Sequence, residues 1–132
     1  MVKVLDASAL LVYLAKEPAY DKVKDLFVKA AGSERKLLMT VLNMGEVYYI
    51  LAKDHGLEEA GKVYQFVIET FPIEFVPADL SLTQQAVLYK INYKLPYVDS
   101  FTAALAKLRK GELVTADKDF KAVEGEIKIV WV

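Results

Sequence analysis

The sequence predicts an α/β protein, an α/β/α sandwich in which a mainly parallel central sheet of about five strands is flanked by helices. Short apolar segments rich in β-branched residues alternate with longer segments of helical periodicity along the whole chain. Strands joined by helical crossovers pair in parallel and bury both faces of their sheet. The 132 residues contain no internal repeat, low-complexity tract or linker, which predicts one domain over residues 1–132.

The first apolar segment shows this pattern most clearly. Residues 2–5 read Val-Lys-Val-Leu and end abruptly at Asp6, and the good helix formers of Ala7–Leu14 follow without Gly or Pro. This order predicts a short buried strand that runs directly into a helix. In open α/β sheets, ligands bind in the crevice outside the carboxyl ends of the strands. Asp6 is therefore expected to lie in such a crevice.

Caps, breakers and periodicity define the remaining elements. Thr40 is expected to cap a helix, residues 81–84 have the form of a capping box, and a helix begins at Asp99 or Ser100 after the connector of residues 95–98. The expected helices are Ala7–Leu14, Tyr20 to about Ala30, Val41 to about Lys53, Leu57–Thr70, Ser81 to about Tyr93, and Asp99 or Ser100 up to Gly111; the expected strands are Val2–Leu5, Leu37–Met39, Ile73–Val76, Glu112–Thr115 and Ile127–Val132.

Composition excludes several classes of protein and site. The 55% hydrophobic content excludes a disordered chain, and 17 Lys and Arg against 18 Asp and Glu give no global basic footprint for nucleic acid. Because there is no Cys and only one His, thiolate and His-rich metal sites are excluded. Any metal must be held by oxygen ligands, which favours Mg²⁺ or Mn²⁺.

The chain carries no targeting or membrane signal. Only Lys3 precedes an apolar run that Asp6 soon breaks, which is not the pattern of a signal peptide. No stretch approaches the roughly 20 apolar residues that span a bilayer. We therefore expect a soluble, cytoplasmic protein without membrane attachment, and the preference for Lys over Arg is in keeping with a thermophilic source.

Acidic residues stand where strands end or helices begin. Asp6 follows the first strand, where a carboxylate also serves as a helix N-cap, and Asp117 follows the strand Glu112–Thr115, where turn chemistry alone also explains an Asp. Asp119 is either an outer ligand or a solvated side chain. Asp99 begins a helix, where the positive end of the helix dipole favours a carboxylate.

Glu46 is the acid that is hardest to explain by structure alone. Its helix is apolar nearly all round over residues 41–51, which predicts a largely buried element. No Lys or Arg lies within four residues on either side, so no salt bridge within the helix is available. A buried carboxylate must be neutralised. Either a distant basic side chain or a metal ion is expected to do so.

Together these acids predict a metal site at the carboxyl edge of the sheet. Four carboxylates in one cleft of low dielectric repel one another strongly, and one or two divalent cations remove that repulsion. Such an ion lowers the pKa of bound water and stabilises a phosphoryl transition state. The chemistry expected is hydrolysis of a phosphodiester by a metal-activated water, with no covalent protein intermediate.

Four motifs in this chain resemble those of PIN domains, most closely the small VapC-type toxins of VapBC toxin–antitoxin systems. The resemblance covers the whole chain, with the motifs in the family's order. Each motif is weak alone, and the four together are specific. They are Val4-Leu5-Asp6-Ala7-Ser8-Ala9-Leu10-Leu11, Asn43-x-x-Glu46, the run Val98-Asp99-Ser100-Phe101-Thr102-Ala103-Ala104-Leu105-Ala106, and Leu113-Val114-Thr115-Ala116-Asp117-Lys118-Asp119-Phe120.

The resemblance implies a PIN-like fold and a Mg²⁺- or Mn²⁺-dependent endoribonuclease that leaves 5′-phosphate and 3′-hydroxyl ends on its RNA substrate. It also implies a cognate antitoxin protein whose tail inserts into the acidic groove. The implied site has catalytic acids Asp6, Glu46, Asp99 and Asp117, of which Asp6, Asp99 and Asp117 hold the metal, with Asp119 as an accessory acid and with Ser8, Asn43 and Thr115 orienting carboxylates or bound waters.

Two other functions remain open at this point. A non-catalytic PIN-like module would bind RNA or a protein partner through the same groove. An aspartyl-phosphate phosphotransfer enzyme would use Asp6 as a nucleophile. Haloacid-dehalogenase-like enzymes place a second Asp two residues later, where this chain has Ser8, and receiver-like domains pair acids near the end of the first strand, where Leu5 precedes the single Asp6. Both departures count against phosphotransfer.

Other residues have mainly structural interpretations. His55 is expected at a helix end, and four tyrosines are expected in the core or at a dimer contact: Tyr48, Tyr49, Tyr89 and Tyr93. A homodimer through the apolar helices of residues 20–70 is expected. Seven basic residues are a candidate phosphate-contacting set, although such side chains are most often only solvated: Lys16, Lys94, Lys107, Arg109, Lys110, Lys118 and Lys121. The RNA target and the number of metals are not encoded in these motifs.

Overall fold

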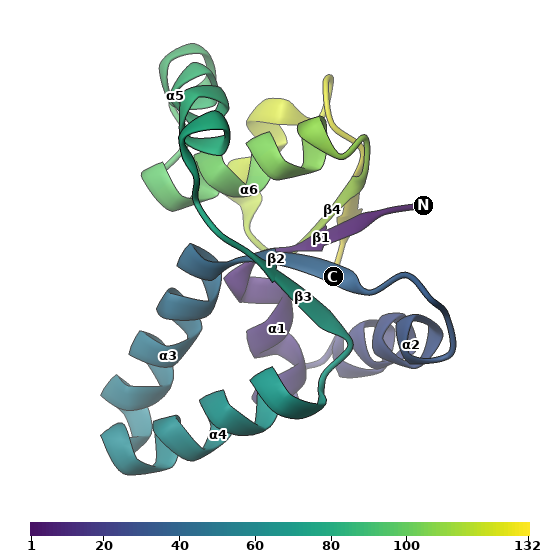
Figure 1. The fold of residues 1–132 in the computed structure, drawn as a ribbon, viewed down its shortest axis with the longest axis vertical. Coiled ribbons are helices and arrows are strands. Elements are labelled where there is room, and N and C mark those ends of the chain that lie inside the picture. Colours follow the sequence, from purple (N-terminus) through teal and green to yellow (C-terminus); the bar gives the residue numbers. More distant parts are fainter.

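A computed structural model describes all residues 1–132 and places five strands in one sheet of order β3-β2-β1-β4-β5 (Figure 1). Every adjacent pair of strands is parallel, so the predicted α/β fold with a central parallel sheet is confirmed. The elements are β1 (Lys3–Leu5), α1 (Ala7–Leu14), α2 (Tyr20–Ala31), β2 (Leu37–Thr40), α3 (Val41–His55), α4 (Leu57–Thr70), β3 (Ile73–Val76), α5 (Leu80–Tyr93), α6 (Tyr97–Leu108), β4 (Glu112–Thr115), the 3₁₀ helix η1 (Lys118–Val123) and β5 (Ile129–Trp131).

Helices cover the two faces of the sheet in two groups, α5 and α6 on one side and α1–α4 on the other (Figure 1). Successive side chains of a strand point to opposite faces. Val4 and Leu113 accordingly pack with the α5 and α6 residues, whereas Leu5 and Val114 pack with residues of α1 to α4. Because both faces are buried, the inner strands β1, β2 and β4 are mostly apolar, as parallel strands are, whereas the edge strand β3 exposes Glu74.

Local chemistry explains where several elements begin and end. Thr40 caps α3 as predicted, because its Oγ1 accepts a hydrogen bond from the Asn43 amide at 3.1 Å. Gly56 ends α3 with φ of 89°, a conformation that other residues rarely adopt. At Gly111 a Cβ atom would lie 2.7 Å from the backbone oxygen of Val2, so only glycine lets β4 start this close to β1. None of the helices combines the length and apolar character needed to cross a bilayer.

The predicted starts of two helices were wrong. Helix α5 begins at Leu80 and is capped by Asp79, whose Oδ1 accepts from the Leu82 amide at 2.9 Å, so Ser81 is already inside the helix. Helix α6 begins at Tyr97 rather than at Asp99 or Ser100. Pro96 precedes it, and a proline favours the start of a helix because it has no amide hydrogen to lose.

The last strand is shorter than predicted. It spans only Ile129–Trp131, whereas the sequence predicts strand from Ile127 to Val132. The side chain of Ile127 is instead buried in the core between the sheet and α5–α6. Ile127 is therefore apolar because it packs in the core just before the strand, and not because it belongs to the strand.

Candidate active site

Four carboxylates from four elements meet at the carboxyl edge of the sheet. Asp6 follows β1 and Asp117 follows β4, and these strands are parallel neighbours with Leu5 opposite Val114. Glu46 comes from α3 and Asp99 from α6. They line a cavity of about 210 Å³ together with other residues of α1 and α3: Ala7, Ser8, Leu11, Asn43 and Ile50.

Asp6 is buried and tightly held. One carboxylate oxygen accepts hydrogen bonds from Ser8 Oγ at 2.7 Å and from the Ala9 amide at 2.9 Å, and the other accepts from Thr115 Oγ1 at 2.6 Å. Asp6 is thus the N-cap of α1 as well as a wall of the cavity. Ser8 Oγ also accepts from the Ala116 amide at 2.9 Å, so these bonds tie the end of β1 to the end of β4.

The side chain of Asn43 hydrogen-bonds to a backbone amide and to two hydroxyl groups, and to none of the carboxylates. Its buried Oδ1 accepts from the Ala7 amide at 3.2 Å, and its Nδ2 donates to Thr40 Oγ1 at 3.0 Å and to Thr102 Oγ1 at 2.6 Å. The side chain thereby joins the first turns of α1 and α3 to α6, the helix that carries Asp99. Thr102 was missed by the sequence analysis, although a Thr inside an otherwise apolar helical run was a signal for a buried hydrogen bond.

The surroundings of Glu46 correct one sequence-based prediction. Helix α3 is not largely buried: only Asn43, Met44 and Val47 are buried in it, and Tyr49 is 65% exposed. Glu46 itself is half-buried at the cavity. It takes part in none of the ion pairs in the structure, so no distant basic side chain neutralises it.

Burial and mutual repulsion raise the pKa of three of these acids. Burial first, and then Asp117, Asp6, Glu46 and Asp119, raise the pKa of Asp99 to about 8. Burial also raises the pKa of Asp6, although its three hydrogen bonds oppose the shift, and it raises the pKa of Glu46, with Asp6 and Asp117 adding to it. A cluster of acids whose pKa values are raised is typical of functional sites.

A second grouping of acids fits a metal ion by geometry. Asp99, Asp117 and Asp119 each offer one carboxylate oxygen, and these oxygens lie within 4.8 Å of one another. The resemblance implied Asp6, Asp99 and Asp117 as ligands. Because Asp6 already accepts three hydrogen bonds, it has less capacity left for a metal than Asp119 has. Oxygen ligands alone suit a hard divalent cation.

The sequence profile of the PIN domain matches residues 3–126 of this chain. This chain belongs to the PIN domain family. Its fold is similar to that of DNA-bound VapBC from Salmonella typhimurium, with a TM-score of 0.77 and 18% identity over 98% of this chain and 97% of that one. It is also similar to VapBC2 from Rickettsia felis, with a TM-score of 0.75 and 17% identity over 100% and 99% of the two chains.

A third similar structure is VapC20 from Mycobacterium tuberculosis, described as a sarcin-ricin loop cleaving toxin, with a TM-score of 0.73 and 14% identity over 98% of both chains. No curated protein sequence matches this one. The structural neighbours are thus VapC and VapBC proteins of toxin–antitoxin systems. At these identities the likeness shows the PIN fold, and the chemistry of this chain must be argued from its own residues.

The seven basic residues singled out by sequence do not form one patch in this PIN domain. Arg109 pairs with Glu74 at 3.8 Å and Lys107 with Glu126 at 3.7 Å. Arg109 and Lys110 also follow α6 directly before β4, at the amino edge of the sheet and therefore opposite the acidic cavity. Of the set, Lys118 and Lys121 lie in η1, which begins beside Asp117.

The aromatic and histidine side chains have structural surroundings. The hydroxyl groups of Tyr89 and Tyr93 both donate to the Glu126 carboxylate, the former at 2.9 Å. Tyr48 packs on Tyr64 of α4, with ring centroids 4.7 Å apart. His55 is the exposed last residue of α3. None of these side chains lines the acidic cavity.

The raised pKa of Asp99 predicts a pH-dependent stability of the metal-free protein. The Asp99 carboxyl group binds its proton more tightly in the folded state than in the unfolded chain. Its contribution to the free energy of unfolding is therefore fully present below about pH 4 and is lost as the pH rises to about 8. Between pH 5.5 and 8.5 in EDTA, we expect the free energy of unfolding to fall by at least about 1 kcal/mol, roughly 4 °C in melting temperature. Asp99→Asn should reduce this slope, and Asp25→Asn, which removes an exposed acid of α2, should keep it. Equal slopes in all three proteins would contradict the assignment.

The contact between Asn43 and Thr102 predicts a stability cost for Thr102→Val. The substitution keeps the shape of the side chain but leaves a buried Asn43 N–H without its 2.6 Å partner. We expect a loss of about 1–3 kcal/mol in the free energy of unfolding, measured by urea denaturation. Thr70→Val is the matched control, because the exposed Thr70 hydroxyl donates only to the Phe66 backbone oxygen. A similar loss in both variants would show that the buried contact has no special weight.

Proposed function

We propose that this PIN domain, residues 1–132, is a metal-dependent endoribonuclease of the VapC toxin type that hydrolyses RNA phosphodiester bonds by a metal-activated water. The observation that carries the proposal is the cavity in which Asp6, Glu46, Asp99 and Asp117 meet without any basic side chain among its lining residues. Such a cluster is stabilised either by protonation or by positive charge from outside the chain. A divalent cation would supply this positive charge, and a phosphate ester would be the substrate that the cation helps to bind.

The residues present fit Mg²⁺ or Mn²⁺. Asp99, Asp117 and Asp119 would hold the ion, with Asp6 completing the negative wall of the site. When bound, such an ion lowers the pKa of water and stabilises the charge that develops on a phosphodiester. Ser8 and Thr115 keep the Asp6 carboxylate in one orientation through their 2.7 and 2.6 Å hydrogen bonds. Preorganised charge of this kind requires little rearrangement during the reaction.

Glu46 differs from Asp6 in having no hydrogen bond that fixes its carboxylate. It is half-buried, faces the cavity and has a raised pKa, so it is suited to accept a proton from the attacking water. In the proposed reaction the water oxygen would form a bond to phosphorus, the bond between phosphorus and the 3′ oxygen would break, and the 3′ oxygen would take up a proton from solvent. The products would carry 5′-phosphate and 3′-hydroxyl ends.

The neighbouring structures support RNA as the substrate and a second protein as the partner. One neighbour is described as a toxin that cleaves the sarcin-ricin loop, and others are VapBC complexes. We therefore propose a cognate antitoxin for this chain and a location in the cytoplasm. A small protein that co-purifies with the chain and suppresses its RNA cleavage would support that partner. Cleavage that is unaffected by every such protein would count against it.

The alternative within enzymes is further weakened by geometry. A phosphotransfer nucleophile needs a free carboxylate oxygen that can attack phosphorus. Both oxygens of Asp6 accept hydrogen bonds from Ser8, Ala9 or Thr115. A non-catalytic module that binds RNA or protein through the same groove is the remaining alternative, and a cleavage experiment separates it from the nuclease.

The nuclease prediction is tested by cleavage of a panel of structured RNAs with Mg²⁺, Mn²⁺ or EDTA. We expect metal-dependent cuts with 5′-phosphate ends, and we expect Asp99→Asn to lower the rate at least about 100-fold because it removes a charged ligand from the cavity. Asp25→Asn serves as the control, since it removes one negative charge far from the cavity.

Each result of this experiment has a distinct meaning. Cuts that persist in Asp99→Asn would come from a contaminating nuclease. If no RNA is cut although Mn²⁺ raises the melting temperature of the native chain and not of Asp99→Asn, the metal site stands, and a very selective toxin and a non-catalytic binding module are the two functions that remain. If Mn²⁺ also leaves the melting temperature unchanged, the proposed metal site is wrong.

We also propose that the chain forms a homodimer, and the exposed apolar side chains suggest the face. The sequence analysis expected the helices of residues 20–70. Those helices have exposed apolar side chains such as Tyr49, Leu57 and Phe66, and a further set lies along one side of α5 at helical spacing: Leu80, Val87, Leu88 and Ile91, from 44% to 84% exposed. Such a stripe is costly in water unless a partner covers it.

Sedimentation analysis of the purified chain should give about twice the 14.8 kDa mass of one chain. Ile91→Lys places a charge in the α5 stripe and should yield monomers. Phe66→Lys, at an exposed apolar position of α4, should leave the dimer intact. Monomers from Phe66→Lys and not from Ile91→Lys would move the interface to the helices that the sequence analysis favoured. A monomeric native chain would exclude the dimer.

A further inference from the structure

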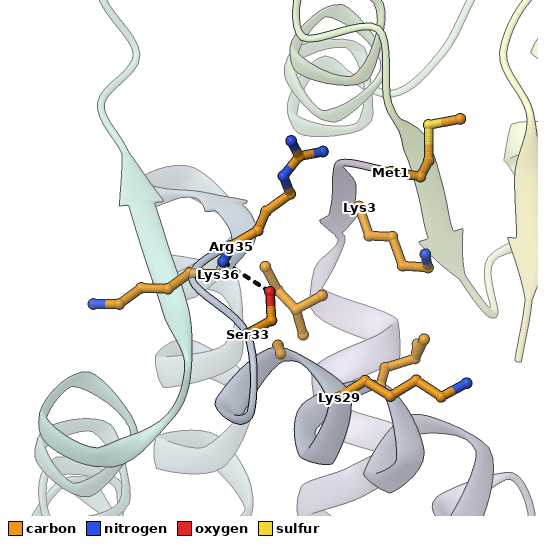
Figure 2. Close-up of a pocket in the computed structure, with 9 residues that line it drawn as sticks. Met1, Lys3, Lys29, Ser33, Arg35 and Lys36 are labelled. Carbon is orange, nitrogen blue, oxygen red and sulfur yellow. Dashed lines mark hydrogen bonds between the residues drawn. The ribbon is translucent and has the colours of Figure 1, made fainter.

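A second hollow lies at the amino edge of the sheet, away from the acidic cavity. It has a volume of about 430 Å³ and is bordered by the start of β1, the end of α2 and the segment that leads into β2 (Figure 2). Lys3 and Asp6 stand at opposite ends of β1, which separates the two sites by roughly 10 Å of strand. The lining residues are Met1, Lys3, Leu26, Lys29, Ala30, Ser33, Arg35, Lys36 and Leu37.

The charged side chains of this hollow are all basic. Lys3, Lys29, Arg35 and Lys36 line it, and no Asp or Glu does. The whole chain has 17 basic and 18 acidic residues, so four cations without an acid are a local concentration of charge that the net charge of −1 does not reveal. Lys29, Arg35 and Lys36 form none of the ion pairs in the structure.

The remaining cation, Lys3, is paired, but its partner is shared. The buried carboxylate of Glu112 forms ion pairs with the ammonium groups of Lys3, at 3.3 Å, and Lys128, at 2.8 Å. One negative charge is thus shared by two positive charges. The C-terminal end of α2 adds about half a negative charge beside the hollow, which Lys29 in its last turn offsets. Glu34 and Glu74 line an adjoining hollow that shares Arg35 and Lys36, and Glu74 is paired with Arg109. The nearby cations still outnumber the acids.

The directions of the side chains select three of the four cations. In Figure 2 the ammonium groups of Lys3 and Lys29 extend to the same side of the hollow, Arg35 rises from the loop above them, and the ammonium of Lys36 lies well apart on the other side. The Arg35 amide donates to Ser33 Oγ at 3.0 Å, which shapes the loop that carries the guanidinium. Lys36 is therefore set apart, and Lys3, Lys29 and Arg35 are the candidate binding groups of the hollow.

We propose that this hollow is a binding site for phosphate groups, with Lys3, Lys29 and Arg35 as the binding residues. A guanidinium gives paired hydrogen bonds to phosphate oxygens, and an ammonium adds charge without a fixed direction. A volume of about 430 Å³ admits a diphosphate or a backbone segment of a nucleic acid. The opposite edge of the sheet is acidic and repels such a ligand in the absence of metal. The site is therefore separate from the proposed nuclease centre and does not depend on it.

The first test uses inorganic pyrophosphate as the probe, in EDTA and at low salt. We expect a saturable change in the amide NMR signals of Lys3, Ser33, Arg35 and Lys36 in the native chain. The double variant Lys29→Gln with Arg35→Gln should weaken pyrophosphate binding at least about 10-fold, because two of the three cations are lost. Melting temperatures near that of the native chain would show that the variant is folded.

The matched control is Lys53→Gln with Lys90→Gln, which removes the same charge at exposed positions of α3 and α5. It should bind pyrophosphate within about twofold of the native chain. Equal weakening in both double variants would show an effect of net charge alone and would overturn the site. Signal changes that do not saturate, or that spread evenly over all lysines, would overturn it as well.

A second arm identifies the source of the phosphate. A fluorescent RNA stem-loop is titrated with the chain in EDTA, with and without saturating pyrophosphate. If pyrophosphate and the Lys29/Arg35 double variant both weaken RNA binding, and the RNA affinity falls steeply with added salt, the site takes the RNA backbone. If RNA binding is unaffected while pyrophosphate still binds at the hollow, the ligand is a free phosphate compound. Neither arm measures RNA cleavage. If the nuclease proposal proved wrong, the outcome of this binding test would therefore not change.

Discussion

The placement of several carboxylates in one partly buried cavity is the constraint on which this structure depends. Like charges at such a distance destabilise a folded chain unless something offsets their repulsion. The fold holds one of these acids, Asp6, in a fixed orientation by hydrogen bonds. Asp6 directly follows the central strand β1, and the hydroxyl groups of Ser8 and of Thr115 at the end of the neighbouring strand β4 each hydrogen-bond to its carboxylate. An arrangement that costs stability in the free protein is typical of sites that serve binding or catalysis.

The sheet also separates charge along the strand direction. Acids gather at its carboxyl edge, and at its amino edge cations outnumber the acids that lie among them. A formal net charge of −1 therefore conceals two local fields of opposite sign. A polyanion approaching this chain meets attraction at one edge and, without metal, repulsion at the other. If the proposed metal and RNA bind, the orientation of the RNA on the surface would depend on whether the acidic cavity holds a cation.

The sequence was sufficient for the order and type of the strands and α-helices because each had its own local pattern, whereas the 3₁₀ helix η1 was not predicted. Boundaries failed where two local signals competed: Asp79 and Ser81 both suit a helix cap, and the Asp is two residues earlier. The burial of α3 was overestimated because an apolar sequence cannot show which side lacks a neighbour. The bond between Asn43 and Thr102 joins residues 59 positions apart, and only the packing of α6 against α3 brings them together.

From the sequence, helix cap and site acid are competing interpretations of Asp6, and the geometry shows that they are compatible. An N-cap residue turns its carboxylate back toward the first amides of the helix, at the end where the dipole favours negative charge. When the helix follows a parallel strand directly, that end is also the crevice at the carboxyl edge of the sheet. Asp117 repeats the arrangement after β4, accepting the Asp119 amide at 2.9 Å. Capping is thus the means by which these short connections hold carboxylates at the edge where a cation and a phosphate can meet them.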